Sequence, residues 1–213
     1  YRVTTSYQGE SSLSSSFSDV FAYSYGSFGE VRHFKHPYRA IPQDSFRSEQ
    51  YRFNIFECFR ACIETFRAPT PPLAAGRELA LVGATSMLDV SDGLLRDAGR
   101  IARASGVVID LDDPGDLPDA SFLEPVSALV SGHGGSEARA LARRWLLTGG
   151  EDHGLLATVP AHALDRLPTG ARVIGRVLSP QSSPARVLGH RPGVLLAGEP
   201  AQEHTGWDHF SHT

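Results

Sequence analysis

The chain has 213 residues, of which 41% are hydrophobic and 21% charged, and its formal net charge is −4. This length allows one large domain or two small ones, and the composition is ordinary for a soluble globular protein. No apolar run approaches the roughly 18 residues of a membrane-spanning helix, and no secretory signal is recognisable, so we expect a cytoplasmic protein without a membrane partner.

Charge is distributed unevenly along the chain. Residues 1–67 carry 8 Lys and Arg against 7 Asp and Glu, whereas residues 68–213 carry 12 against 17. Because nucleic-acid binding requires clustered basic residues at the phosphates, the acidic second part argues against that class of partner. It is compatible with a divalent cation held by carboxylates.

The first part of the chain has a different composition from the second. All six Tyr and nine of the eleven Phe lie before residue 68, and residues 1–34 show no clear helical or strand period. Cys58 and Cys62 lack further zinc ligands nearby, so we interpret them as thiols in an apolar patch. Residues 45–67 predict an amphipathic helix whose core-facing stripe consists of Phe53, Phe56, Phe59, Ile63 and Phe66.

A proline cluster marks the predicted domain boundary. Pro69, Pro71 and Pro72 read as a linker, because proline cannot continue a helix and stiffens an extended chain. We therefore divide the chain into an atypical Ser- and aromatic-rich segment, residues 1–67, and a domain over residues 68–213. The first segment either folds with the domain or stays poorly ordered.

The second part alternates between strand and helix patterns. Residues 84–90 and 107–112 predict strands on either side of a helix over 92–104, which Gly106 ends as a C-terminal cap. The rest predicts a helical stretch over 123–144 interrupted at 131–135, a short helix over 161–167, and strands over 154–159, 171–178 and 193–198, the last paired with 185–189. This mixture predicts an α/β (α+β) fold, a mixed β-sheet packed against helices.

The first chemical motif, Asp-Val-Ser-Asp-Gly-Leu, starts at Asp89, where the first of these strands turns into a helix. A helix start explains Ser91 as the N-cap and Asp92 in the first turn, where an acid complements the helix dipole. It does not explain Asp89, because a carboxylate that closes an apolar strand loses hydration. Two carboxylates and a hydroxyl are also oxygen ligands of the kind Mg²⁺ prefers, so a metal site and a simple helix start both stand.

Two further motifs follow. In Gly149-Gly150-Glu151-Asp152, the glycines allow a sharp turn or a close backbone approach, and the acids precede a strand. An ordinary polar turn is the alternative, and we interpret His153 beside it as solvated. In the terminal Gly-Trp-Asp-His-Phe, Trp207 either stacks on a flat ring or covers the edge of the core.

Together and in this order, these motifs resemble the C-terminal half of thiamine-monophosphate kinase, a family of the superfamily that includes aminoimidazole ribonucleotide synthetase. The resemblance covers roughly residues 67–210. It implies transfer of the γ-phosphoryl group of ATP to thiamine monophosphate, giving thiamine diphosphate, with several Mg²⁺ ions and a homodimer. Carried over by position, it implies Mg²⁺ ligation by Asp89 and Asp92, ATP contact by Ser91, and substrate contacts by Glu151, Asp152 and Trp207.

The chain departs from the family pattern in two places. The family usually continues Gly-Gly-Glu-Asp with Tyr-Glu, where this chain has His153 and Gly154. Residues 1–67 also lack the Gly-Asp-Asp-Ala metal motif of the family's N-terminal half. A catalytically incomplete member and a related enzyme with another substrate therefore stand as alternatives to an active kinase.

Overall fold

A computed structural model describes residues 19–24, 49–116, 118–150 and 153–201. The centre of the fold is a seven-stranded sheet with the order β2-β4-β1-β5-β3-β6-β7. Among the described strands, only β3 and β6 pair in parallel, and every other neighbouring pair is antiparallel. The strands are β1 (Asp19–Ser24), β2 (Ser86–Asp89), β3 (Val108–Leu111), β4 (Leu155–Pro160), β5 (Ala171–Leu178), β6 (Gly193–Leu196) and β7 (Glu199–Pro200).

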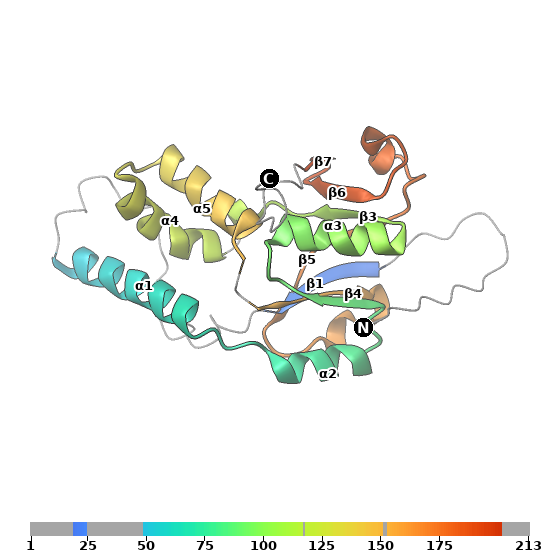
Figure 1. The fold of residues 1–213 in the computed structure, drawn as a ribbon, viewed down its shortest axis with the longest axis horizontal. Coiled ribbons are helices and arrows are strands. Elements are labelled where there is room, and N and C mark those ends of the chain that lie inside the picture. The colour runs from blue at the N-terminus through green and yellow to red at the C-terminus, as the bar shows by residue number, and fades with distance from the viewer. Residues whose placement is uncertain (1–18, 25–48, 117, 151–152, 202–213) are drawn as a thin grey trace, which may run out of the picture.

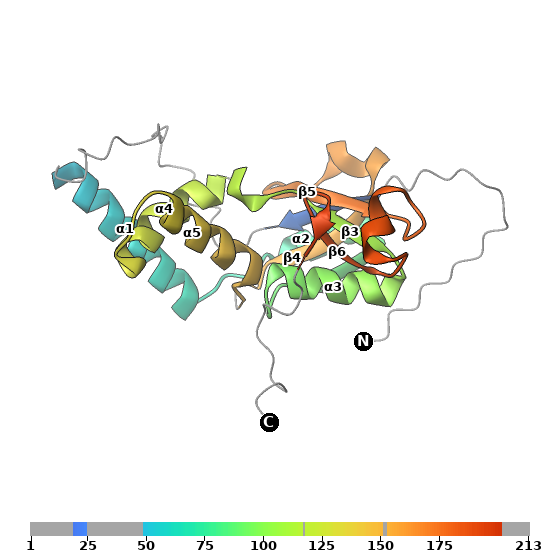
Figure 2. The same cartoon turned by 90° about the horizontal axis from the view of Figure 1, so that it is seen from above.

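Helices lie on the sheet and beside it. Helix α3 (Leu94–Ser105) and helix α2 (Leu73–Leu81) cover parts of the sheet, and α1 (Glu49–Arg67), α4 (Pro118–Ser131) and α5 (Ser136–Thr148) group to one side of it (Figures 1 and 2). Short 3-10 turns occupy η3 (Pro114–Asp116), η4 (Ala161–Arg166) and η5 (Pro184–Leu188). The predicted α/β fold with a mixed sheet is confirmed. Among the described helices, none is both long and apolar enough to span a bilayer.

Strand β4 is buried on both of its faces, which explains its continuous apolar sequence. Leu156 packs with the apolar stripe of α3, whereas Ala157 and Val159 pack with Leu79 of α2. Because successive side chains of a strand point to opposite faces, α2 and α3 cover opposite sides of the sheet. The α3 side holds the larger cluster, which consists of Val90, Leu95, Ala98, Ile101, Ala102, Ile109, Leu111, Leu147, Leu156, Ile174 and Val194.

Strand β1 joins the N-terminal segment to this sheet. It lies between β4 and β5 and pairs with both in antiparallel orientation. One strand from residues 1–67 therefore belongs to the same sheet as the strands of residues 68–213. The sequence pattern of residues 1–34 did not predict it, and the boundary at residue 67 stays a prediction.

Helix α1 confirms the predicted helix but not the predicted core-facing stripe. In the described residues it spans Glu49–Arg67, and it packs against α4, whereas residues 45–48 of the predicted helix lie outside the described part. Phe56 is 63% exposed and Phe66 71% exposed, with Ile63 also exposed. The side chains of Phe53 and Cys58 lie outside the described residues, and Cys62 is a half-buried thiol. The helical period was right, but the interpretation of the apolar face as core was wrong for Phe56, Ile63 and Phe66, whereas Phe59 is half-buried.

The predicted pairing of residues 185–189 with the last long strand is also wrong. Pro184 starts η5, and Gly189 ends it with a φ of 62°. Proline presets φ for a helical turn, and glycine adopts the left-handed conformation without strain, so this segment forms a turn. Strand β6 pairs instead with β3 and β7.

Candidate functional site

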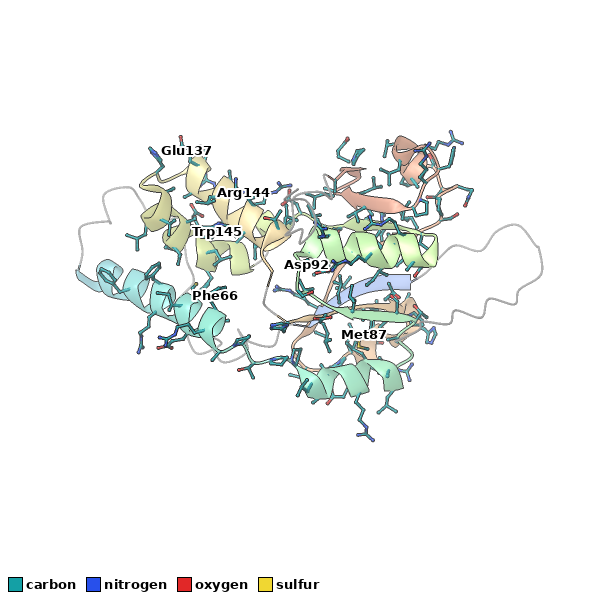
Figure 3. The ribbon with its side chains drawn as sticks, viewed as in Figure 1. Phe66, Met87, Asp92, Glu137, Arg144 and Trp145 are labelled. Atoms are coloured by element: carbon teal, nitrogen blue, oxygen red, sulfur yellow. The ribbon has the colours of Figure 1, made fainter. Side chains whose placement is uncertain are left out.

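The candidate site is the turn from β2 to α3, at one end of the sheet. Asp89 is the last residue of β2, and its side chain is 52% exposed. Asp92 is buried, with 8% of the residue exposed, and lies at the N-terminal end of α3 (Figure 3). Between them Val90 packs into the core. The expectation that the Asp89 carboxylate loses hydration is therefore wrong, because this residue ends the strand facing solvent, whereas the neighbouring Asp92 is the one drawn inward.

Asp97, in the first turn of α3, holds this turn in shape. Its side chain is fully buried, and its Oδ2 accepts hydrogen bonds from the backbone N–H groups of Ser91 and Asp92, each at 3.0 Å. Amides that precede a helix have no intrahelical partner, so a carboxylate reaching back from the helix satisfies them. Asp97 is the acceptor that the sequence analysis missed.

The predicted N-cap at Ser91 is wrong. The helix begins after Gly93, which has a φ of 109° and makes no side-chain cap hydrogen bond. Asp92 consequently lies before the helix rather than in its first turn. The positive φ of Gly93, a conformation that favours glycine, places the start of the helix two residues later than predicted, and Asp97 binds the N–H groups of Ser91 and Asp92 that lie before it. The other end agrees with prediction, since Gly106 is left-handed and caps α3.

Arg100 joins the two buried carboxylates. Its Nη1 lies 2.5 Å from Oδ1 of Asp97, and its Nη2 contacts Oδ2 of Asp92. Partial burial lowers the pKa of Arg100, but the hydrogen bond to Asp92 and the charges of Asp97 and Asp92 outweigh it and raise the pKa above its ordinary value. Arg100 therefore stays charged, and Asp92 has a cation beside it before any metal arrives.

The paired glycines bring the second motif against this turn. A Cβ on Gly150 would lie closer than 3.0 Å to the carbonyl oxygen of Ser91, and a Cβ on Gly93 would lie 2.8 Å from that of Thr148. The end of α5 and the start of α3 thus meet backbone to backbone, which only glycine permits. The interpretation of Gly149 and Gly150 as a close approach is confirmed for Gly150.

Strand pairing continues past the end of β2. The N–H of Val90 donates to the carbonyl of Gly154 at 2.8 Å, and the N–H of His153 donates to the carbonyl of Val90 at 3.1 Å. His153 has a φ of 52°, and its Nδ1 lies 4.0 Å from Oδ2 of Asp89. A half-exposed imidazole therefore stands beside the exposed carboxylate of the turn, as expected for a solvated histidine.

The predicted substrate-contacting residues lie outside the described residues. Glu151 and Asp152 lie in the chain between Gly150 and His153. Gly150 and His153 are the residues that contact the β2–α3 turn. Trp207 belongs to the terminal stretch, residues 202–213, which is also outside the described part. The roles assigned to all three stay predictions.

The donor chemistry of the turn fits Mg²⁺. Among the described residues, no group of three or more His, Cys, Asp or Glu side chains is placed to hold a metal ion. Mg²⁺ does not need such a cage, because it keeps several waters and binds through one or two carboxylates plus substrate phosphates. Asp89 offers an accessible carboxylate, whereas Asp92 would have to exchange its contact with Arg100.

A second carboxylate–guanidinium pair lies away from this turn. Asp110 of β3 is buried, and its Oδ2 accepts from Arg176 of β5 at 2.8 and 3.1 Å. Its other oxygen accepts from the N–H of Gly198 at 2.9 Å. The pair lines a hollow of about 530 Å³. Since both oxygens of Asp110 have donors, the pair ties β3 to β5 and to the turn before β7.

Sequence comparison matches the chain to one set of relatives. No protein-family model matches. The chain is 39% identical over 157 residues to thiamine-monophosphate kinase of Mycobacterium tuberculosis, a match that covers 74% of this chain and 40% of the relative. It is 39% identical over 124 residues to thiamine-monophosphate kinase of Corynebacterium glutamicum, covering 58% of this chain and 34% of the relative. The resemblance predicted from the motifs is therefore confirmed.

Structural comparison gives the same answer for the fold. A solved structure, AaThiL complexed with AMPPCP and TMP, superposes with a TM-score of 0.58 at 22% identity and covers 92% of this chain and 52% of that one. The chain spans about 40% of the length of the Mycobacterium tuberculosis relative. The fold is thus shared with one part of a longer protein.

Proposed function

We propose that this chain, which resembles the C-terminal half of thiamine-monophosphate kinase, takes part in the ATP-dependent phosphorylation of thiamine monophosphate to thiamine diphosphate. The observation that carries the proposal is the backbone contact between Gly150 and Ser91, which joins the two motifs at one site. The identity of 39% over 157 residues to a kinase of that name supports it.

The chemistry of the turn suits phosphoryl transfer. Such a reaction asks a protein mainly to position the reactants and to neutralise charge on the phosphates. We assign Asp89 and Asp92 as Mg²⁺ ligands and Ser91 as an ATP contact. A bound Mg²⁺ would neutralise phosphate charge, while Asp97 holds the backbone of Ser91 and Asp92 in place.

The substrate side of the site is assigned from position in the chain. Glu151 and Asp152 follow the glycine that touches Ser91, so we propose them for the thiamine phosphate site, with Trp207 near the substrate ring. The resemblance also implies a homodimer, and the exposed Phe56 and Phe66 of α1 are apolar side chains that a second subunit would cover. Sedimentation velocity of the purified chain tests the homodimer, and a cytoplasmic location stays part of the proposal.

Thiamine diphosphate formation by the purified chain tests the function. The assay contains thiamine monophosphate, ATP and Mg²⁺, and compares wild type with Asp89→Asn. Asp89 is the better target because its side chain is half exposed, whereas Asp92→Asn would also disturb the ion pair with Arg100. The matched control is Asp165→Asn, an exposed acid on η4. We expect turnover in wild type and control, and at least about a hundredfold loss in Asp89→Asn.

The outcome also separates the alternatives. Turnover that Asp89→Asn leaves unchanged would remove Asp89 from the metal site. If the wild-type chain folds but shows no turnover, the proposal that this chain catalyses the reaction by itself is overturned. The chain would then be a catalytically incomplete member of the family. Turnover of ATP with a different phosphate acceptor would favour a related enzyme.

A further inference from the structure

Arg100 is a cation placed where the proposed metal would bind. Its Nη2 contacts Oδ2 of Asp92, and the side chain of Asp92 is only 11% exposed. A guanidinium and a divalent cation both seek the oxygens of the same carboxylate, and their like charges repel each other at short distance. The two therefore compete for Asp92.

Arg100 has a second anchor that does not depend on Asp92. Its Nη1 binds Oδ1 of Asp97, one helical turn earlier on α3, and Asp97 is fully buried. Asp97 is itself fixed by the amides of Ser91 and Asp92. The guanidinium can thus lose Asp92 and keep Asp97, and its side chain is 42% exposed, so water can solvate the released end.

The charges of the turn show why such a cation is useful there. Asp89, Asp92 and Asp97 place three carboxylates within nine residues, and Asp92 and Asp97 are both buried. Burying carboxylates without a positive partner is costly. Arg100 supplies that partner in the metal-free site.

We propose that Arg100 is a built-in competitor of Mg²⁺ for Asp92: it occupies this carboxylate in the metal-free protein and thereby weakens metal affinity. This inference rests on the proposed function only in taking Asp92 as a metal ligand. It makes Arg100 a positioning residue that sets how much Mg²⁺ the site requires, and it predicts that removing Arg100 tightens metal binding.

Metal affinity measured without turnover tests this inference. The full chain is titrated with Mn²⁺ alone, free Mn²⁺ is counted by electron paramagnetic resonance, and Mg²⁺ is then added as a competitor. Arg100→Gln removes the guanidinium, and Arg103→Gln removes an equal charge from an exposed position of the same helix. We expect Arg100→Gln to bind Mn²⁺ about fivefold tighter than wild type, the size typical of one partly exposed ion pair. Arg103→Gln stays within twofold.

A double-mutant cycle shows whether Arg100 acts through Asp92. In an Asp92→Asn background, Arg100→Gln should leave the remaining affinity nearly unchanged. Equal tightening in both backgrounds would overturn competition at Asp92 and leave only a general effect of charge. Unchanged or weaker binding by Arg100→Gln alone would also overturn it, and would indicate that Arg100 orients Asp92 for the metal.

A second variant keeps the inference testable if Arg100→Gln does not fold. Arg100→Lys keeps one positive charge but loses the planar fork that reaches both carboxylates, so its affinity should lie between those of wild type and Arg100→Gln. If Arg100→Gln does not fold, wild-type affinity in Arg100→Lys overturns the inference. If no variant binds metal, the inference fails together with the metal role of Asp92. A wild type that binds Mn²⁺ but makes no thiamine diphosphate leaves the inference standing and refutes only the catalytic proposal.

Discussion

Replacing Asp97 by Asn should unfold the turn that carries the candidate site. The change is nearly isosteric, but it removes the negative charge and one of the two acceptor oxygens. In the native protein Oδ2 accepts two backbone N–H groups and Oδ1 contacts Arg100. An amide can keep only one of these roles, because its NH₂ group points a donor either at the two amides or at the guanidinium.

The expected cost follows from these contacts. A hydrogen bond to a charged group is worth about 1.5–3 kcal/mol, and removing one member of a buried ion pair costs about 3–5 kcal/mol. These terms overlap, so we expect the free energy of unfolding to fall by about 3–5 kcal/mol. For a chain of this length each kcal/mol lowers Tm by about 2–4 °C, so Tm should fall by roughly 6–20 °C.

Urea and thermal unfolding followed by circular dichroism measure this cost. Asp112→Asn is the matched control, because Asp112 is an exposed acid at the end of β3, and we expect it to change stability by less than about 0.5 kcal/mol. A loss below about 1 kcal/mol in Asp97→Asn would refute the reasoning. Such a result would mean that hydrogen bonds from the Ser91 and Asp92 amides to water replace those to the Asp97 carboxylate at little cost.

Three further changes test other parts of the fold. Gly150→Ala places a Cβ against the carbonyl of Ser91 and should lower the free energy of unfolding by about 1–3 kcal/mol in urea titrations, whereas a neutral result would contradict the backbone contact. The hydrogen bond from Arg143 lowers the pKa of Asp113 below its ordinary 3.8, so the ion pair should stabilise the protein above that pH and be lost as pH falls through the lowered value. The Tm of wild type should therefore exceed that of Asp113→Asn near pH 6, and this difference should shrink as the pH falls through the lowered pKa; a difference that stays constant across the acid titration would disprove the linkage. Leu79→Ala leaves a cavity between α2 and β4, because Leu79 is 1% exposed there, and it should lower the free energy of unfolding by about 2–5 kcal/mol in urea titrations. A loss below about 1 kcal/mol would show that α2 does not cover this face of the sheet.

Local sequence determined the elements that flank the site. An apolar strand, a helical apolar period and a glycine in the left-handed cap position are short-range features, and β2, α3 and Gly106 follow from them. The glycine pair predicted a close backbone approach for the same reason, since the absence of a side chain is visible in sequence. These features depend on steric and hydrophobic preferences of neighbouring residues.

Tertiary contacts decided how the charges of the site are used. Asp97 lies at the edge of the apolar face of α3, and an acid followed three residues later by Arg100 is a signal that could have identified the pair. The pairing of Arg100 with Asp92 spans the turn itself, and no local rule separates a metal ligand from a carboxylate held by arginine. That choice depends on how far each group is removed from water once the sheet and α3 have packed.

The same division applies to the sheet. The helical period of α1 was visible in the sequence, but the element that α1 packs against was not. Helix α1 packs against α4, and Phe56 and Phe66 remain exposed. Strand β1 showed no alternating pattern, yet it lies between β4 and β5, where both neighbours supply backbone partners. Sequence by itself determined where the chain turns and which motifs it carries. The tertiary structure decided which strands pair, because β1 and β4 lie more than a hundred positions apart in the chain. It also decided which carboxylate faces water, because Asp92 and Asp97 become buried only when α3 packs on the sheet.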